Sequence, residues 1–104
     1  SIPSSANQED HVSMGTTAAR KAGLILDNVQ KVLAIEAFAA SQAISFRDKP
    51  ILGRGTKKAY EEIRKHVLPV EEDRIMYTDM DKLDKMIKDG IFVRVVEDYI
   101  GELW

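Results

Sequence analysis

A polar block near the start of the chain holds the residues best suited to chemistry. It reads Asn7-Gln8-Glu9-Asp10-His11 and runs directly into a long stretch rich in alanine. Carboxylates, carboxamides and an imidazole in one block can pair with a cationic substrate, donate hydrogen bonds and transfer protons. The same residue types also stabilise the first turn of a helix, whose unpaired N–H groups attract negative charge. From residue types alone, helix capping is the favoured role of Glu9 and Asp10.

Composition and charge exclude several other kinds of site. The 104 residues include no cysteine, which rules out disulfides, a thiolate nucleophile and cysteine-based metal sites. His11 and His66 stand far apart without the spacing of metal-ligand pairs, so we expect no metal site. The net charge of −2 provides no general attraction for nucleic acid or anionic membranes. No apolar run is long enough to span a bilayer, and we expect a cytoplasmic protein without membrane or nucleic-acid partners.

A long helix is predicted to position the polar block. From Thr16 onward, apolar residues recur at three- and four-residue spacing in two neighbouring stripes, and Glu36 is the only ionisable residue between Val32 and Phe46. A helix that is apolar on most sides must be buried all round, so it needs neighbours from outside this short chain. Glu36 must then find a partner or lie at an assembly seam, and structural pairing is the favoured role. Either Asn7 or Ser13 is suited to cap the helix start.

Three shorter helices are expected after this long one. Pro50 and the Gly53-Arg54-Gly55 turn, whose glycines permit positive φ, precede a helix capped by Thr56. Its apolar face is formed by Ala59, Ile63 and Val67, while His66 lies on the surface.

A capping box at Thr78 begins the next helix, and Gly90 ends it. Its buried stripe consists of Met80, Leu83 and Ile87. Residues 91–96 have the β-branched character of a strand but also a helical stripe, and we favour helix because no partner strand is visible. The sequence therefore predicts an all-α fold with one long helix and three shorter ones.

The polar block and the residues after it resemble a known family. Ser5 to Gly15 is similar to the carboxyl-terminal region of the histidine ammonia-lyases, a branch of the aromatic amino acid lyases, and the similarity continues through Ala18-Ala19-Arg20, Asn28-Val29, Leu33-Ala34-Ile35-Glu36, Gly53-Arg54-Gly55-Thr56 and Glu71-Glu72-Asp73-Arg74. The resemblance covers essentially the whole chain, more loosely in the last helices. It implies the final fifth of a subunit, with an active-site segment (1–15), a bundle helix (16–47) and peripheral helices (48–104).

The resemblance implies a lyase activity that these residues do not complete alone. The family removes ammonia from L-histidine to give urocanate, using 4-methylideneimidazole-5-one formed from an internal Ala-Ser-Gly triplet. No glycine here follows a serine, so the electrophile has to come from outside this chain and the chain by itself should be inactive. Two alternatives remain: a family member acting on another aromatic amino acid, as lyase or aminomutase, and a non-catalytic helical assembly module.

Roles for single residues also follow from the resemblance. Glu9 matches the acid that enters the active site in relatives acting on histidine, whereas phenylalanine and tyrosine lyases have a neutral amide there. We therefore predict Glu9 as a catalytic and substrate-binding acid and Gln8 as a weaker substrate-binding residue. Asn7, Asp10 and His11 are expected to hold the turn or a subunit contact. The family assembles as a homotetramer around a central helix bundle, which implies the rest of the subunit and further copies as partners.

Overall fold

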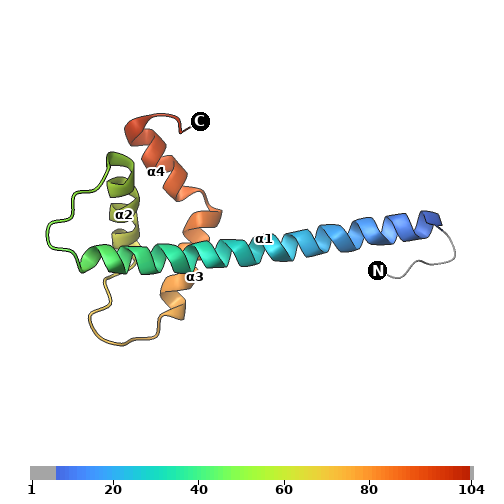
Figure 1. The fold of residues 1–104 in the computed structure, drawn as a ribbon, viewed down its shortest axis with the longest axis horizontal. Coiled ribbons are helices and arrows are strands. Elements are labelled where there is room, and N and C mark those ends of the chain that lie inside the picture. Colours follow the sequence, from blue (N-terminus) through green and yellow to red (C-terminus); the bar gives the residue numbers. More distant parts are fainter. Residues whose placement is uncertain (1–6, 104) are drawn as a thin grey trace.

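The chain folds into helices joined by short connections (Figure 1). The computed structural model describes residues 7–103, with side chains from Met14 onward, and contains α1 (Asn7–Ser45), α2 (Arg54–His66), α3 (Tyr77–Lys88) and α4 (Ile91–Ile100). Within these residues there is no strand. The expected all-α fold of one long and three shorter helices is confirmed, and residues 91–96 are helical.

The first helix dominates the molecule. α1 has 39 residues, which corresponds to a length of about 58 Å at 1.5 Å per residue. Its sequence is rich in alanine and free of proline, so nothing interrupts the backbone ladder. The helix passes through Ser13 without a new start, which excludes Ser13 as its cap. It ends where Phe46 N–H bonds to Ala43 O (3.3 Å) and Arg47 N–H to Ile44 O (3.0 Å), the tighter pattern of a last turn.

Helices α2, α3 and α4 gather around one end of α1. α3 packs against α1 and α4, while α2 packs against α4 and α3. Figure 1 shows the three short helices clustered at the carboxyl end of α1, while the other half of α1 extends away from them. We call residues 30–103 the cap and residues 14–29 of α1 the arm.

The cap contains the hydrophobic core. Its buried members come from α1, from α2 with the residue after it, and from α3: Ala34, Phe38, Ile63, Val67, Leu83 and Met86. Ile91 and Phe92 at the start of α4 are half-buried against this cluster. The apolar faces predicted for the second and third helices therefore do face a core, with Ile63, Val67 and Leu83 buried.

The starts of α2 and α3 differ from the predictions. Gly53 precedes α2 and Met76 precedes α3, and neither helix has a side-chain cap. Thr56 and Thr78 lie inside the helices instead of before them. At α2 the first backbone bond runs from Lys57 N–H to Gly53 O (2.8 Å), and Gly53 has no side chain to accept from the N–H groups before Lys57.

The glycine turn was also predicted wrongly. Gly53 has φ −59°, and Gly55 is part of α2. The positive φ in this connection belongs to Lys49, at 48°. Gly90 does adopt the left-handed conformation, with φ 72°, after α3 has ended.

Three polar side chains tie the connections of the cap to its helices. Gln42 makes two hydrogen bonds to the backbone of Val70. Its Nε2 donates to Val70 O (2.8 Å), and Val70 N–H donates to its Oε1 (2.9 Å). Arg64 donates from Nη2 to Ser41 O (2.8 Å). Arg74 pairs with the buried Asp79 through Nε and Oδ2 (3.1 Å) and donates to the carbonyls of Leu68 and Pro69. These bonds satisfy backbone groups that the short helices leave unpaired.

Candidate functional site

The predicted site residues lie at the beginning of α1. The backbone of Gln8 and Glu9 is helical, within the first turn of α1, as are Asn7, Asp10 and His11. The side chains of all five lie outside the described residues. The acid–base role of Glu9 and the hydrogen-bonding role of Gln8 therefore stay predictions.

The beginning of α1 is remote from the cap. Along the axis of α1, Glu9 lies about 32 Å before Gln30, the first residue of the cap. Gln30 is joined to α3 by a hydrogen bond to Asp84. Figure 1 shows the same separation, with the blue end of α1 far from α2, α3 and α4. No cap side chain among the described residues can reach that far. Any pocket around Glu9 has to be completed by residues other than those of the cap.

The arm presents a large apolar surface to solvent. Leu24, Leu26 and Ile25 are 65%, 67% and 56% exposed, and Met14 and Val29 are also exposed. The exposed apolar surface continues into the cap with Val32, Leu33 and Ile35. The residues at successive positions 24 to 26 project about 100° apart around the helix axis, so the exposed apolar surface covers more than one face of the arm. The expectation that this chain cannot bury its own long helix agrees with the exposed arm.

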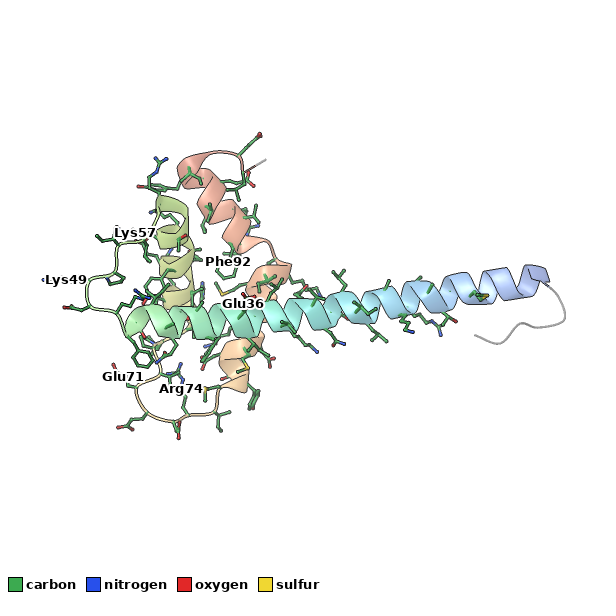
Figure 2. All side chains as sticks on the ribbon, viewed as in Figure 1. Glu36, Lys49, Lys57, Glu71, Arg74 and Phe92 are labelled. Carbon is green, nitrogen blue, oxygen red and sulfur yellow. The ribbon has the colours of Figure 1, made fainter. Side chains whose placement is uncertain are left out.

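Glu36 does not find its expected partner within the described part of the chain. Its side chain is exposed on α1 (Figure 2), and none of the ion pairs found among the described residues includes it. Among the short helices, α3 makes the main contact with α1, and the buried face of α1 there includes Ala34 and Phe38. A basic partner for Glu36 therefore stays a prediction.

A charged hollow between α2 and α4 is the main polar feature that sequence reasoning missed. It has a volume of about 340 Å³ and is lined by Lys58, Glu61, Glu62, Lys65, Val95, Asp98 and Tyr99. Lys58 Nζ lies 4.5 Å from the centre of the Tyr99 ring, and Lys65 Nζ lies 3.0 Å from Glu62 Oε2. Lysines and glutamates three apart on one helix were a readable signal for such pairs.

The charges in this hollow largely neutralise one another. The hydrogen bond from Lys65, aided by its charge and by His66, holds the pKa of Glu62 below its ordinary value of 4.5, although burial opposes this shift. His66 is surface-exposed as predicted, with its Nε2 3.5 Å from Glu62 Oε1. The pairs Lys58–Glu61 and Lys65–Glu62 thus stabilise α2 locally and offset most of the charge that lines this hollow.

The part of the chain that the structure describes shows neither a metal-site cluster nor a membrane-spanning helix. No group of three or more histidine, cysteine, aspartate or glutamate side chains is arranged to hold a metal ion there. No described helix combines the length and apolar character needed to cross a bilayer. Neither finding assigns a function to the cap.

Comparison with known proteins places the chain in a family. Residues 1–65 match the family described as aromatic amino acid lyase. The chain is 53% identical to a histidine ammonia-lyase of Natranaerobius thermophilus, 52% to one of Alkaliphilus metalliredigens and 50% to one of Symbiobacterium thermophilum. Each match covers 99% of this chain but 20% of the relative, so the chain spans about one fifth of their length. No solved structure matches the chain.

The matches and the fold agree with one another. The family match covers α1, which carries the polar block, and continues nearly to the end of α2. The relatives extend the similarity through the remaining cap helices. The all-helical structure is consistent with both. The chain belongs to the aromatic amino acid lyase family.

Proposed function

We propose that this chain is the carboxyl-terminal part of a histidine ammonia-lyase, which deaminates L-histidine non-oxidatively to urocanate and ammonia. The observation that carries the proposal is Glu9 within the Gln8-Glu9-Asp10-His11 block. Support comes from the relatives named histidine ammonia-lyase, which are 50% or more identical over nearly the whole chain. A lyase or aminomutase acting on another aromatic amino acid is the alternative against which the test below is designed.

Glu9 supplies chemistry that a neutral amide at this position does not. A carboxylate pairs with the ammonium or imidazolium of the substrate through a charge-assisted hydrogen bond. It also accepts a proton, which releases a free amine for reaction. Gln8, next to it, both donates and accepts hydrogen bonds and is suited to orient the substrate without taking its proton.

The family electrophile has to be supplied by residues outside this chain. 4-Methylideneimidazole-5-one requires an Ala-Ser-Gly triplet, and none of the six glycines here follows a serine. When present, this group provides the electrophilic centre that activates the amino group for departure. The residues of this chain are therefore assigned to substrate pairing and proton transfer, and we expect the chain alone to be inactive.

We further propose that α1 is a helix of a multi-helix bundle in a homotetramer, with the remaining part of the lyase subunit as a second partner. Exposed leucine, isoleucine and valine residues along α1 support this proposal, because an apolar surface of this extent marks an interaction site. A cytoplasmic location is expected, in keeping with the absence of cysteine.

A chimeric enzyme tests the proposed substrate. In it, these 104 residues replace their counterpart in the histidine ammonia-lyase of Natranaerobius thermophilus, to which the chain is 53% identical. We expect urocanate formation from L-histidine, followed by its ultraviolet absorbance, and no turnover of L-tyrosine or L-phenylalanine. Turnover of tyrosine in place of histidine would favour the alternative. A correctly assembled chimera that turns over no amino acid would favour the non-catalytic module.

The chimera also tests the role of Glu9. Glu9→Gln is expected to lower kcat at least about tenfold, because the amide retains hydrogen bonding but loses both the charge and the proton acceptor. Asp10→Asn is the matched control, since it removes a neighbouring charge and should leave kcat within about threefold if Asp10 serves only the helix start. Near wild-type kcat and KM for Glu9→Gln would remove Glu9 from the site.

A further inference from the structure

We propose that α1 has two levels of stability in this chain, divided at Gln30. The cap fixes the helix from Gln30 onward, whereas every residue of the arm (residues 14–29) is exposed and none is buried against the cap. Ordering of the arm therefore depends on contacts from outside the chain. This inference concerns folding and stands whether or not the proposed substrate is correct.

The boundary is visible in burial and in hydrogen bonds. Every residue from 14 to 29 is exposed, and Gln30 is the first partly buried residue among the α1 side chains that the structure describes. Gln30 Nε2 donates to Asp84 Oδ1 (2.8 Å) and to Asp84 O (3.3 Å) on α3. One and two turns later, Ala34 and Phe38 enter the core with 1% and 8% exposure. Contact with the cap therefore begins abruptly at Gln30.

The arm lacks the means to stabilise itself. Helix propagation in water adds little per residue, and most helical stability in proteins comes from packing of an apolar face. Leu24, Ile25 and Leu26 are exposed, so the arm gains no such packing from the chain. Gly15 and Gly23 lower its intrinsic helicity further, since glycine is the poorest helix former after proline. We expect the arm to fray from its amino-terminal side toward Gln30.

The boundary at Gln30 affects the amino-terminal end of α1, where the polar block lies. Because helix order spreads outward from the cap, every turn before Gly23 depends on Gly23 being helical. The polar block lies on the far side of the arm. Assembly with other chains, or with more of the same subunit, would thus order the segment that leads to Glu9, coupling formation of the polar site to association.

Amide hydrogen exchange on the 104-residue chain, measured by NMR on a dilute monomer, tests the proposal. Amides of residues 36–41 should be protected at least about 100-fold more than amides of residues 18–24, as expected between a core element and a fraying one. Gly23→Ala should raise protection of the arm amides about fivefold, because alanine restores helix propensity. An added methyl group meets nothing within 4 Å, and cap amides should not change.

Each outcome of this experiment is decisive. Arm protection that rises with protein concentration, together with a larger mass in ultracentrifugation, would support the inference, since a second copy then supplies the missing contact. A monomer whose arm amides exchange as slowly as those of residues 36–41 would overturn it. A chain in which cap amides are as unprotected as the arm would overturn it as well, because the cap would then fix nothing.

Discussion

The arm and the cap share one helix yet live in different surroundings. In the cap, α1 buries Ala34, Phe38 and Ser41 at spacings of four and three residues. One face of the helix is therefore packed against the core, and the opposite face is exposed to solvent. In the arm, Leu24 and Leu26 are 65% and 67% exposed although they are larger and more apolar than Ala34. Hydrophobic character thus indicates which residues gain from burial. Whether a residue is buried depends on the neighbouring helices that pack against it.

The two regions also differ in the side-chain hydrogen bonds that link them to other segments of the chain. Cap connections are tied by side chains that reach distant backbone groups, such as Gln42 to Val70 and Arg64 to Ser41. Gln30 marks the last such tie before the arm. Substitutions of the same chemical type placed in each region should therefore behave differently, and the following predictions use that difference, beginning with the largest effect.

Removing a leucine side chain should separate the regions most clearly. Leu83 has 0% exposure in the core, so Leu83→Ala should destabilise the cap by about 2 to 5 kcal/mol through lost burial and a residual cavity. Leu24→Ala in the arm should change the unfolding free energy of the isolated chain by less than about 0.5 kcal/mol. Urea unfolding followed by circular dichroism measures both. Equal losses would show that the arm is already packed within the chain.

Gln42 should contribute less than a core leucine but more than a surface residue. Gln42→Ala removes both bonds to Val70 and should cost about 1 to 3 kcal/mol, because partly buried backbone groups lose their partners. Gln42→Glu keeps the acceptor for Val70 N–H and loses the donor to Val70 O. Its deficit should shrink as pH falls and the carboxyl gains a proton to donate. A pH-independent deficit for Gln42→Glu would contradict this assignment.

A glycine pair offers a finer comparison. A Cβ at Gly55 in α2 would lie 3.3 Å from Val96 Cγ1 and 3.5 Å from Ile100 Cδ1, whereas one at Gly23 meets open space. Gly55→Ala should therefore lose most of the propensity gain of about 1 kcal/mol that alanine brings to an open helix position. Thermal unfolding should show no rise in Tm for Gly55→Ala. A rise of several degrees would mean that α4 moves away from α2 without cost.

Glu62 should give the smallest effect, present at neutral pH and lost in acid. Its pKa in the folded chain is lowered by Lys65, so the folded state holds fewer protons at this group than the unfolded state does near its ordinary pKa of 4.5. The stabilisation is complete above that value and is lost as pH falls through the lower folded pKa. Glu62→Gln should therefore lower stability slightly at neutral pH, where the pairing is fully formed, and flatten the acid side of the profile, so that variant and original chain converge in strong acid. An unaltered acid profile would contradict the pairing.

The spacing of apolar residues and the position of Gly90 correctly predicted local features of the fold. The spacing of Ile63, Val67 and Leu83 placed the correct faces in the core, and Gly90 was correctly read as a helix end. The helix-capping predictions at Thr56 and Thr78 failed because α2 begins at Arg54 and α3 at Tyr77, which places both threonines inside the helices. The Arg74–Asp79 pair near the start of α3 was not predicted. Such pairs join residues whose geometry depends on the folded loops, which periodicity does not encode.

The sequence by itself determined the helical class, the apolar excess of α1 and the family, because these follow from residue types and their order along the chain. Tertiary structure alone decided that the cap ends at Gln30, that Gln42 holds Val70 and that the polar block stands about 32 Å beyond the cap. The reason is physical: periodicity fixes which side of a helix avoids water, but the neighbour that covers it is chosen by packing between distant segments.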